Sequence, residues 1–385
     1  MKTEWPQLPI TDLFRLKQGT YLKKKEMVDV PDSENPFPVY GANGIIGYSR
    51  KKMYSERTTL ISCRGANCGV VHYTTKNSWI SNNSIALVPR EDIDPTFYYY
   101  LSLSTSFDDV VTGSAQPQIT ITNLSSKEFV KPPLPTQRKI AGILSAYDDL
   151  IENNLRRIKI LEQMAQSLYR EWFVHFRFPG HESAKFVDSA LGQIPKGWEV
   201  RKLETLYRTS SGGTQSRKNL EYYEDGTIDW VKTGELKDCF VLSSEEKITA
   251  QALSKSSAKL FPANTVLIAL YGATIGQLGI LSREAATNQA CCAILEVEQP
   301  FGRAFAYLTL MLRRPDIIGL RLGAAQQNIS QAVLRDFEVI CPPAPLLEAF
   351  NEQAEPMFDL LLNLQHRNQT LRRTRELLLP KLINH

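Results

Sequence analysis

Two short runs of basic side chains stand out, because lysine and arginine can neutralise the phosphates of nucleic acids. The runs are Lys23, Lys24 and Lys25, and Arg50, Lys51 and Lys52. Both lie beside Gly, Asn or aromatic residues, a composition typical of loops. Either run alone is more simply explained as solvated surface, and the net charge of +4 does not by itself indicate a nucleic-acid binder.

The sequence patterns of nucleotide-dependent and hydrolytic enzymes do not occur in the chain. There is no G-x-x-x-x-G-K-[ST] phosphate loop and no G-x-G-x-x-G after a strand. Asn35-Pro36-Phe37-Pro38 has the wrong order for an adenine-methyltransferase motif, and we predict a loop there. Glu245-Glu246-Lys247 lacks the acidic partner of a metal nuclease, and we predict a surface helix. We therefore expect no catalytic residue.

Cysteine and histidine usage also excludes common sites. The six cysteines contain no C-x-x-C pair, and the five histidines are scattered without ligand spacing. We expect no metal site and reduced, mostly buried thiols. No apolar run behind a basic start opens the chain, and no stretch approaches the roughly 20 apolar residues of a membrane-spanning helix. These features predict a cytoplasmic protein that does not contact membranes.

The elements that must position the basic loops are duplicated within the chain. Six residues recur 210 positions later without a gap: Gly113, Gln116, Ile119, Pro132, Pro133 and Pro135 as Gly323, Gln326, Ile329, Pro342, Pro343 and Pro345. This repeat is much longer than the roughly 20 to 50 residues of a solenoid unit. Each half is therefore predicted to be a domain followed by a helical arm.

Each predicted domain is dominated by short strands. The strand segments are rich in β-formers and bounded by Gly, Asn or Pro: 58–62, 69–73, 84–88, 265–270, 276–281 and 291–297. A helix is predicted over 97–103. The segment 64–69 matches 271–276, with glycines four apart that indicate a tight turn of positive φ. Ser81-Asn82 likewise matches Thr287-Asn288.

The predicted arms carry heptad patterns over Ile140–Trp172 and Phe350–Leu382. Asn154 interrupts the first seam, and Asn368 and Arg375 interrupt the second. An Asn at such a position fixes register, although an Asn tolerated near solvent explains the pattern equally well. About 30 residues per arm correspond to a rod of roughly 45 Å. The Pro-Pro-x-Pro segments are predicted to stiffen the exit from each domain.

The expected fold class is α+β, with two similar mixed α/β domains separated by two long helices packed as an antiparallel coiled coil. The 385 residues, 43% of them hydrophobic, suffice for more than one core. The predicted boundaries are 1–135 for the first domain, 136–180 for the first helix, 181–342 for the second domain and 343–385 for the second helix.

The chain resembles the specificity subunits of type I restriction-modification systems. The resemblance rests on Val39–Tyr48 (VYGANGIIGY), the Gly65/Gly69 turn, the G-x-x-Q-x-x-I strings, the Pro-Pro-x-Pro segments and Gln193–Trp198. It implies two target-recognition domains that each read one half of a bipartite double-stranded DNA sequence. It also implies docking of two modification (methyltransferase) subunits and of restriction (endonuclease/translocase) subunits. S-adenosylmethionine, ATP and Mg²⁺ would be bound by those partners, with no cofactor in this chain.

Residues in the predicted loops are candidates for DNA contact. We assign phosphate contacts in the first half-site to Lys23, Lys24, Lys25, Arg50, Lys51 and Lys52, and in the second to Arg208, Arg217, Lys218 and Lys232. Base-edge contacts are assigned to Asn43, Arg64, Asn219, Tyr271 and Gln289, because Arg, Asn and Gln have suitable bidentate geometry. The arms fit half-sites about one DNA turn, roughly 34 to 36 Å, apart. Since the two domains differ between motifs, we expect an asymmetric, interrupted target.

Two other functions fit part of the pattern. A stand-alone sequence-specific DNA-binding regulator would use the same domains without enzyme partners. Its own charge would have to neutralise the phosphates, which the modest net charge disfavours. A coiled-coil adaptor would instead bind proteins through its mixed domains. Purification of the chain alone as a soluble monomer would favour either alternative, whereas poor solubility relieved by a methyltransferase partner would favour the subunit.

Overall fold

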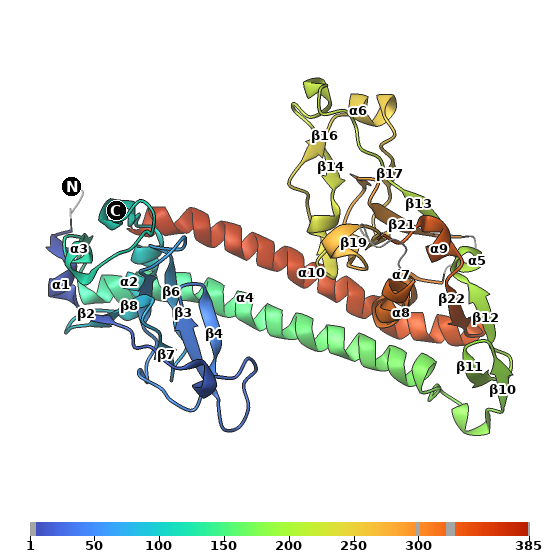
Figure 1. Ribbon diagram of the computed structural model, residues 1–385, viewed down its shortest axis with the longest axis horizontal. Helices are drawn as coiled ribbons and strands as arrows, with labels where there is room; N and C mark the ends of the chain where they lie inside the picture. The colour runs from blue at the N-terminus through green and yellow to red at the C-terminus, as the bar shows by residue number, and fades with distance from the viewer. Residues whose placement is uncertain (1–4, 298–300, 321–327, 384–385) are drawn as a thin grey trace. The chain divides into compact units, whose positions relative to one another are not determined.

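The computed structural model describes residues 5–297, 301–320 and 328–383 (Figure 1). Gly323 and Gln326 of the sequence repeat lie outside the described residues. The chain divides into two compact units. Unit 1 comprises Met1–Glu152 and Thr370–His385, and unit 2 comprises Asn153–Gln369. Each unit therefore combines a mixed domain with segments of both long helices.

The two long helices are α4 (Leu134–Tyr169) and α10 (Ala344–Ile383), of 36 and 40 residues. Both are longer than the predicted heptad patterns of about 30 residues, because they begin directly after a Pro-Pro pair. The N–H of Gln137 donates to Pro133 O at 3.1 Å, and the N–H of Leu347 donates to Pro343 O at 3.2 Å. The third proline of each motif lies in the first helical turn, where its missing N–H costs no hydrogen bond. The proline segments thus start the helices.

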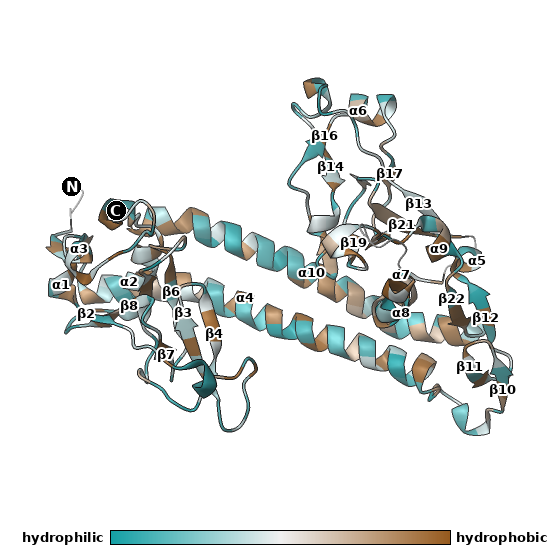
Figure 2. Cartoon of the chain, in the orientation of Figure 1, coloured by the Kyte–Doolittle hydropathy of each residue, from teal (hydrophilic) through white to brown (hydrophobic). Residues whose placement is uncertain are grey.

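Within unit 2 the helices pack antiparallel through the predicted seam. Asn154 Nδ2 donates to Asn368 Oδ1 at 2.9 Å, while the rings of Tyr169 and Phe350 lie 6.1 Å apart. The two asparagines are only 8% and 2% exposed, so they form a buried pair and are not simply tolerated near solvent. Figure 2 shows the alternation of hydrophobic and hydrophilic residues along both helices that this packing requires.

Within unit 1 the remaining polar seam residue, Arg375, has a specific partner. Its guanidinium pairs with Asp148 on α4, and Tyr100 donates to the same carboxylate at 2.5 Å. Tyr100 lies on α2 (Pro95–Leu103), the helix predicted over 97–103. Asp94 caps this helix, accepting from the N–H groups of Thr96 and Phe97. The helix pair of unit 1 is thereby tied to its mixed domain.

The mixed domain of unit 1 contains three small sheets. Their strand orders are β2-β8-β5-β6, β4-β3-β7 and β1-β9. The strands are β1 (Gln7–Pro9), β2 (Phe14–Gln18), β3 (Phe37–Gly41), β4 (Gly44–Ser49), β5 (Thr59–Ser62), β6 (Val71–Tyr73), β7 (Trp79–Ile80), β8 (Ser84–Pro89) and β9 (Glu128–Val130). The other short helices are α1 (Ile10–Leu13), η1 (Lys24–Glu26), η2 (Asp108–Val110) and α3 (Ile121–Leu124).

Unit 2 repeats this plan with additions, in sheets of order β13-β21-β18-β19-β15, β16-β14-β20-β17 and β12-β22. A separate hairpin pairs β10 (Phe186–Ser189) with β11 (Gly192–Pro195). The other strands are β12 (Glu199–Lys202), β13 (Tyr207–Ser211), β14 (Ile228–Val231), β15 (Cys239–Val241), β16 (Lys247–Ile248), β17 (Leu260–Phe261), β18 (Val266–Ala269), β19 (Leu278–Leu281), β20 (Ala285–Thr287), β21 (Cys291–Glu296) and β22 (Glu338–Cys341). The helices, besides the π turn η3 (Arg170–Val174), are η4 (His181–Ser183), α5 (Leu203–Leu206), η5 (Leu220–Tyr222), η6 (Thr233–Glu235), α6 (Ala250–Lys255), η7 (Gly272–Thr274), α7 (Arg303–Leu312), α8 (Arg314–Gly319) and α9 (Gln331–Arg335).

The duplication is visible in the backbone packing of the two domains. A Cβ on Gly19 would lie 2.0 Å from Ser81 O, and a Cβ on Gly212 would lie 2.0 Å from Thr287 O. Both glycines follow an edge strand, β2 or β13, and pass directly over the matched Ser/Thr-Asn segment. Only glycine fits at such a distance. Each domain therefore requires glycine at the same point, which the sequence pattern did not single out.

Two local predictions are wrong. Glu245-Glu246-Lys247 forms a turn and the first residue of β16, because Lys247 pairs with Asp229 and Ile248 with Ile228 on β14. Strand pairing overrides the helical propensity of Glu and Lys here. Phe37 and Pro38, predicted as loop, begin β3. None of the helices in the part of the chain that the structure describes has the length and apolar content to cross a membrane.

Candidate nucleic-acid interface

The two basic runs of unit 1 come together in space. Lys51 Nζ lies 2.5 Å from Glu26 Oε1, at the end of the 3-10 turn η1 that carries two of the other lysines. The backbones of Val28 and Tyr48 exchange two hydrogen bonds at 2.8 and 2.9 Å and fix the two segments side by side. All six basic side chains are exposed. Lys52 Nζ also donates to Asn77 Oδ1 at 2.9 Å.

A second group of predicted residues lies at the other end of the β3–β4 hairpin. Asn43 occupies the hairpin tip, and its side-chain oxygen accepts from Asn67 Nδ2 in the turn that carries Arg64. The carbonyl of Ala42 accepts from Ser62 Oγ at 2.7 Å, which ties the tip to the end of β5. Asn43 and Arg64 are exposed. The structure therefore brings Asn43 and Arg64 together. The length of β4, about 20 Å, separates them from the group of basic side chains.

The turn carrying Arg64 has an equivalent in unit 2 that carries Tyr271. Arg64 forms a β-bridge with Gln118, and Tyr271 forms one with Asn328. All four glycines of the two turns have positive φ, between 71° and 90°. The prediction of tight glycine turns is confirmed. Arg64 and Tyr271 are both exposed, and each opens the turn at the same place in its domain.

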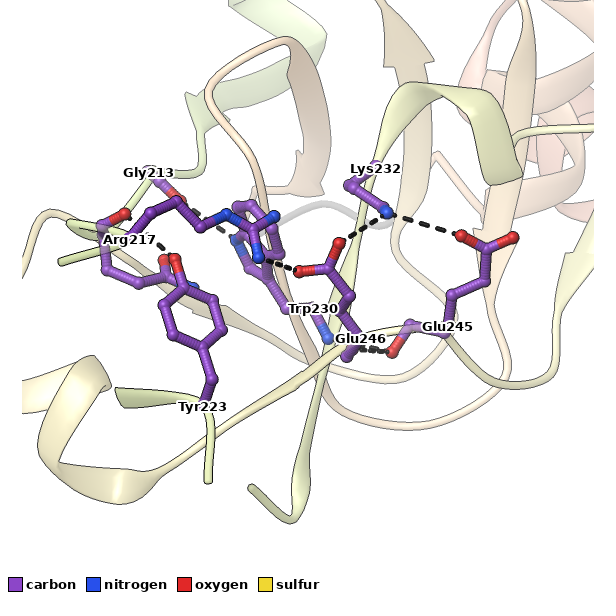
Figure 3. A network of polar contacts seen from close by, with 9 residues as sticks. Gly213, Arg217, Tyr223, Trp230, Lys232, Glu245 and Glu246 are labelled. Atoms are coloured by element: carbon purple, nitrogen blue, oxygen red, sulfur yellow. Dashed lines mark hydrogen bonds and ion pairs between the residues drawn. The ribbon is translucent and has the colours of Figure 1, made fainter. Parts of the chain in front are cut away.

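In unit 2 a loop over residues 212–219 holds three predicted residues on an aromatic support. Arg217, Lys218 and Asn219 are exposed in this loop. The indole of Trp230, only 3% exposed, donates from Nε1 to Gly213 O at 3.1 Å, and Tyr223 Oη donates to Gln215 O at 3.0 Å. Their rings meet edge to face at 6.5 Å. The base of the loop is thus anchored (Figure 3).

Arg217 and Lys232 are joined through one carboxylate, as Figure 3 shows. Glu246 Oε2 lies 2.6 Å from Arg217 Nη1, and Glu246 Oε1 lies 2.8 Å from Lys232 Nζ. Lys232 Nζ also lies 3.4 Å from Glu245 Oε2. Hydrogen bonds from Arg217 and Lys232 lower the pKa of Glu246 to about 2. The guanidinium carbon of Arg217 lies 4.7 Å from the ring centroid of Tyr223 and 5.4 Å from that of Trp230.

The other predicted residues of unit 2 divide into two sets. Gln289 joins the loop, because its side-chain oxygen accepts from Thr214 Oγ1. The turn of Tyr271 is attached to the same region through the bond from Leu270 N to Ala290 O, at 2.9 Å. Arg208 lies separately on β13, exposed and opposite Leu295.

Sequence reasoning missed four residues of these groups: Asn67, Tyr223, Trp230 and Glu246. The Gly65/Gly69 turn already pointed to Asn67, whereas Trp230 and Tyr223 follow no spacing rule. Glu246 was noticed only as part of a triplet and assigned to a helix. Its role depends on contacts with residues 14 and 29 positions away in sequence, 232 and 217, which no local pattern reveals.

The composition of the exposed loops indicates what kind of ligand the protein binds. Exposed Lys and Arg groups position phosphates, and Arg, Asn and Gln side chains on fixed turns can reach base edges. The same construction occurs once in each unit. Two domains with such loops are typical of a protein that recognises DNA.

Comparison with known proteins gives the family. The model of the type I restriction modification DNA specificity domain matches residues 2–163 and again 195–355. The specificity subunit of the type I restriction enzyme MjaIX from Methanocaldococcus jannaschii is 26% identical over 339 residues, covering 86% of this chain and 78% of the relative. The HindI specificity subunit from Haemophilus influenzae is 24% identical over 376 residues, covering 80% and 81%.

A solved structure shares the fold. The crystal structure of a type I restriction-modification system S subunit from M. genitalium superposes with a TM-score of 0.69 at 18% identity, covering 98% of this chain and 96% of that chain. The chain belongs to the family of type I restriction modification DNA specificity domains and contains two of them. It is a sequence-specific DNA-recognition protein of a non-catalytic family, and its two recognition domains fit a target in two parts.

Proposed function

We propose that this chain is the DNA-reading subunit of a multisubunit type I methyltransferase and endonuclease complex. The observation that supports this proposal most is the repetition of one recognition domain, followed each time by a long helix that starts at a Pro-Pro pair. Two similar readers recognise two half-sites. Because the domains differ in their loops, the half-sites differ and the target is asymmetric.

The repeated helices supply the docking surface for two modification subunits. A surface that occurs twice in one chain binds two copies of one partner, each in an equivalent environment. Restriction subunits join this core. S-adenosylmethionine, ATP and Mg²⁺ are bound by these partners, because the sequence carries no phosphate loop and no methyltransferase motif. Since the ligand is DNA, we place the complex in the cytoplasm.

In each domain, the exposed basic groups bind phosphates and the turn residues contact bases. The six Lys and Arg side chains of unit 1 lie within two adjoining segments, as a contact along one stretch of DNA backbone requires, although Lys51 must exchange its ion pair with Glu26 to bind a phosphate. Asn43 and Arg64 occupy fixed turns and reach base edges. In unit 2, Asn219, Tyr271 and Gln289 have the corresponding places, and Lys218 and Arg208 bind phosphates.

Co-expression with the modification subunit of the same operon tests the assembly. We expect a stable complex with two modification subunits per chain, measured by light scattering after size-exclusion chromatography, that transfers labelled methyl groups to DNA. The chain alone should transfer none. A chain that binds one DNA sequence tightly without any modification subunit, and does not associate with it, would contradict the proposal and support a regulator.

A further inference from the structure

The environment of Arg217 does not suit the phosphate contact that sequence reasoning assigns to it. Arg217 and Lys232 carry two positive charges, and Glu245 and Glu246 carry two negative charges within the same network (Figure 3). These four charges cancel, and the carboxylate of Glu235 lies beside them, accepting from Lys232 N and Glu245 N. The side chain of Glu245 is 79% exposed, so an approaching phosphate would meet a carboxylate at the surface. Binding here would release few counterions from DNA.

The same environment suits a planar, uncharged acceptor. A guanidinium has five N–H donors in a rigid fork. The ion pair of Arg217 with Glu246 forms at Nη1. Among the described residues no other hydrogen bond of this guanidinium is seen, so the donors of Nη2 and Nε can serve a second partner. The Arg217 side chain is 59% exposed, so this partner can approach from solvent. Guanine presents two neighbouring acceptors, N7 and O6, in the major groove, whereas adenine presents one acceptor and one donor.

Arg217 is also held in place before any ligand arrives. Tyr223 and Trp230 lie against the guanidinium, and both rings are hydrogen-bonded to the backbone of the loop that carries it. A Cβ on Gly213 would lie 2.2 Å from Ser257 O, so the start of the loop is tightly packed. Fixing a long side chain in advance reduces the entropy lost on binding.

We propose that Arg217 is a specificity-determining residue that reads a guanine in one half-site, and that Glu246 is its positioning residue. This inference rests on the proposed function, since it concerns the DNA that the second recognition domain binds. Glu246 holds the guanidinium through Nη1, and the rings of Tyr223 and Trp230 lie against it. Lys232 pairs with Glu245 and Glu246, and together with Arg217 it balances their two negative charges.

The test compares variants of the purified complex of this chain with its modification subunits. The probes are DNA duplexes that carry the sequence that the complex methylates, and duplexes in which each base pair of the two half-sites is replaced in turn. The binding affinity for each probe is measured at several salt concentrations. We expect both Arg217→Lys and Arg217→Ala to lose about ten- to hundredfold discrimination at one G·C pair. Arg217→Lys, which keeps the charge, should leave the salt dependence of binding unchanged. Lysine retains the charge but lacks the bidentate fork.

The matched control is Lys218→Ala, from the same loop. Lys218 is exposed, and no carboxylate pairs with it among the described residues. It should weaken binding to all sequences alike and reduce the salt slope by about 1. Glu246→Gln should lose discrimination at the same G·C pair as the Arg217 variants, although Arg217 is still present, and should bind unrelated DNA more tightly because a negative charge is gone.

Three results would overturn the inference: uniform weakening by Arg217→Ala like that of Lys218→Ala, intact discrimination in Arg217→Ala, or full discrimination in Glu246→Gln. A wild-type complex that prefers no sequence would instead contradict the proposed function. The two failures are therefore distinguishable, because the wild-type measurement comes first and the variants are compared only with it.

Discussion

At the scale of single residues, charge balance decides what a basic side chain can do. Lys24 and Lys25 are exposed without an ion pair among the described residues, and they suit phosphates, as does the exposed Lys23 beside Glu26. Arg217 and Lys232 have the same charge but share Glu246. Sequence analysis could identify all five residues as basic and loop-borne. It could not separate the residues with an ion pair from those without one, because the carboxylate of Glu246 belongs to a distant part of the sequence.

The shared carboxylate makes stability depend on pH. Two ion pairs lower the pKa of Glu246 from 4.5 to about 2, so the contribution of Glu246 to stability is fully present above pH 4.5 and is lost as pH falls from about 4.5 to about 2. We expect Glu246→Gln to destabilise the protein by about 1 kcal/mol at pH 5.5 and by less at pH 3, allowing for partial solvent screening. Urea unfolding followed by tryptophan fluorescence measures both values.

Glu224→Gln is the control for this experiment, since it removes an exposed carboxylate without an ion pair among the described residues. It should change the free energy of unfolding little at either pH. An equal effect of Glu246→Gln at pH 5.5 and pH 3 would contradict the ion-pair network.

At the scale of elements, the sequence predicted most of the fold because the signals were local. The strands β5, β8, β18 and β21 are runs of β-formers bounded by turn residues, and the glycines of the turns have the positive φ that their spacing predicts. The turn at Glu245 and Glu246 was missed for the opposite reason. Its geometry depends on Asp229, whose carboxylate accepts from Ser244 Oγ at 3.1 Å, and on the pairing of β16 with β14.

The pair Asn154–Asn368 gives a prediction for the long helices. A single Asn154→Leu change leaves a buried, unsatisfied amide on Asn368, and we expect a loss of about 1 to 3 kcal/mol in the free energy of unfolding. The double change Asn154→Leu with Asn368→Leu should recover stability, because two apolar groups replace both partners. A double-mutant cycle by urea unfolding measures the coupling. Additive effects of the two single changes would show that the amides do not act as a pair.

At the scale of the whole molecule, the internal sequence repeat by itself predicts two domains and two helices. The repeat did not show that each compact unit takes helix segments from both halves of the sequence. Unit 1 includes Thr370–His385, and Ile383 is buried in its core. Such a combination depends on contacts between residues more than 200 positions apart, which a pattern along the chain does not encode.

Because each unit carries its own recognition loops, changes in one unit should alter one part of the target only. Arg64 in unit 1 and Arg217 in unit 2 occupy separate domains of the same family. Arg64→Ala and Arg217→Ala should therefore each relax the specificity for a different half of the recognised sequence and leave the other half unchanged.

The most direct test is single-molecule sequencing of methylated adenine in cells that express the modification subunit with the wild-type chain, Arg64→Ala or Arg217→Ala. We predict one interrupted, asymmetric sequence for the wild type, relaxed in one half by Arg64→Ala and in the other half by Arg217→Ala. A continuous palindrome, an absence of methylation, or relaxation of the same half by both variants would contradict recognition of a two-part target by two domains.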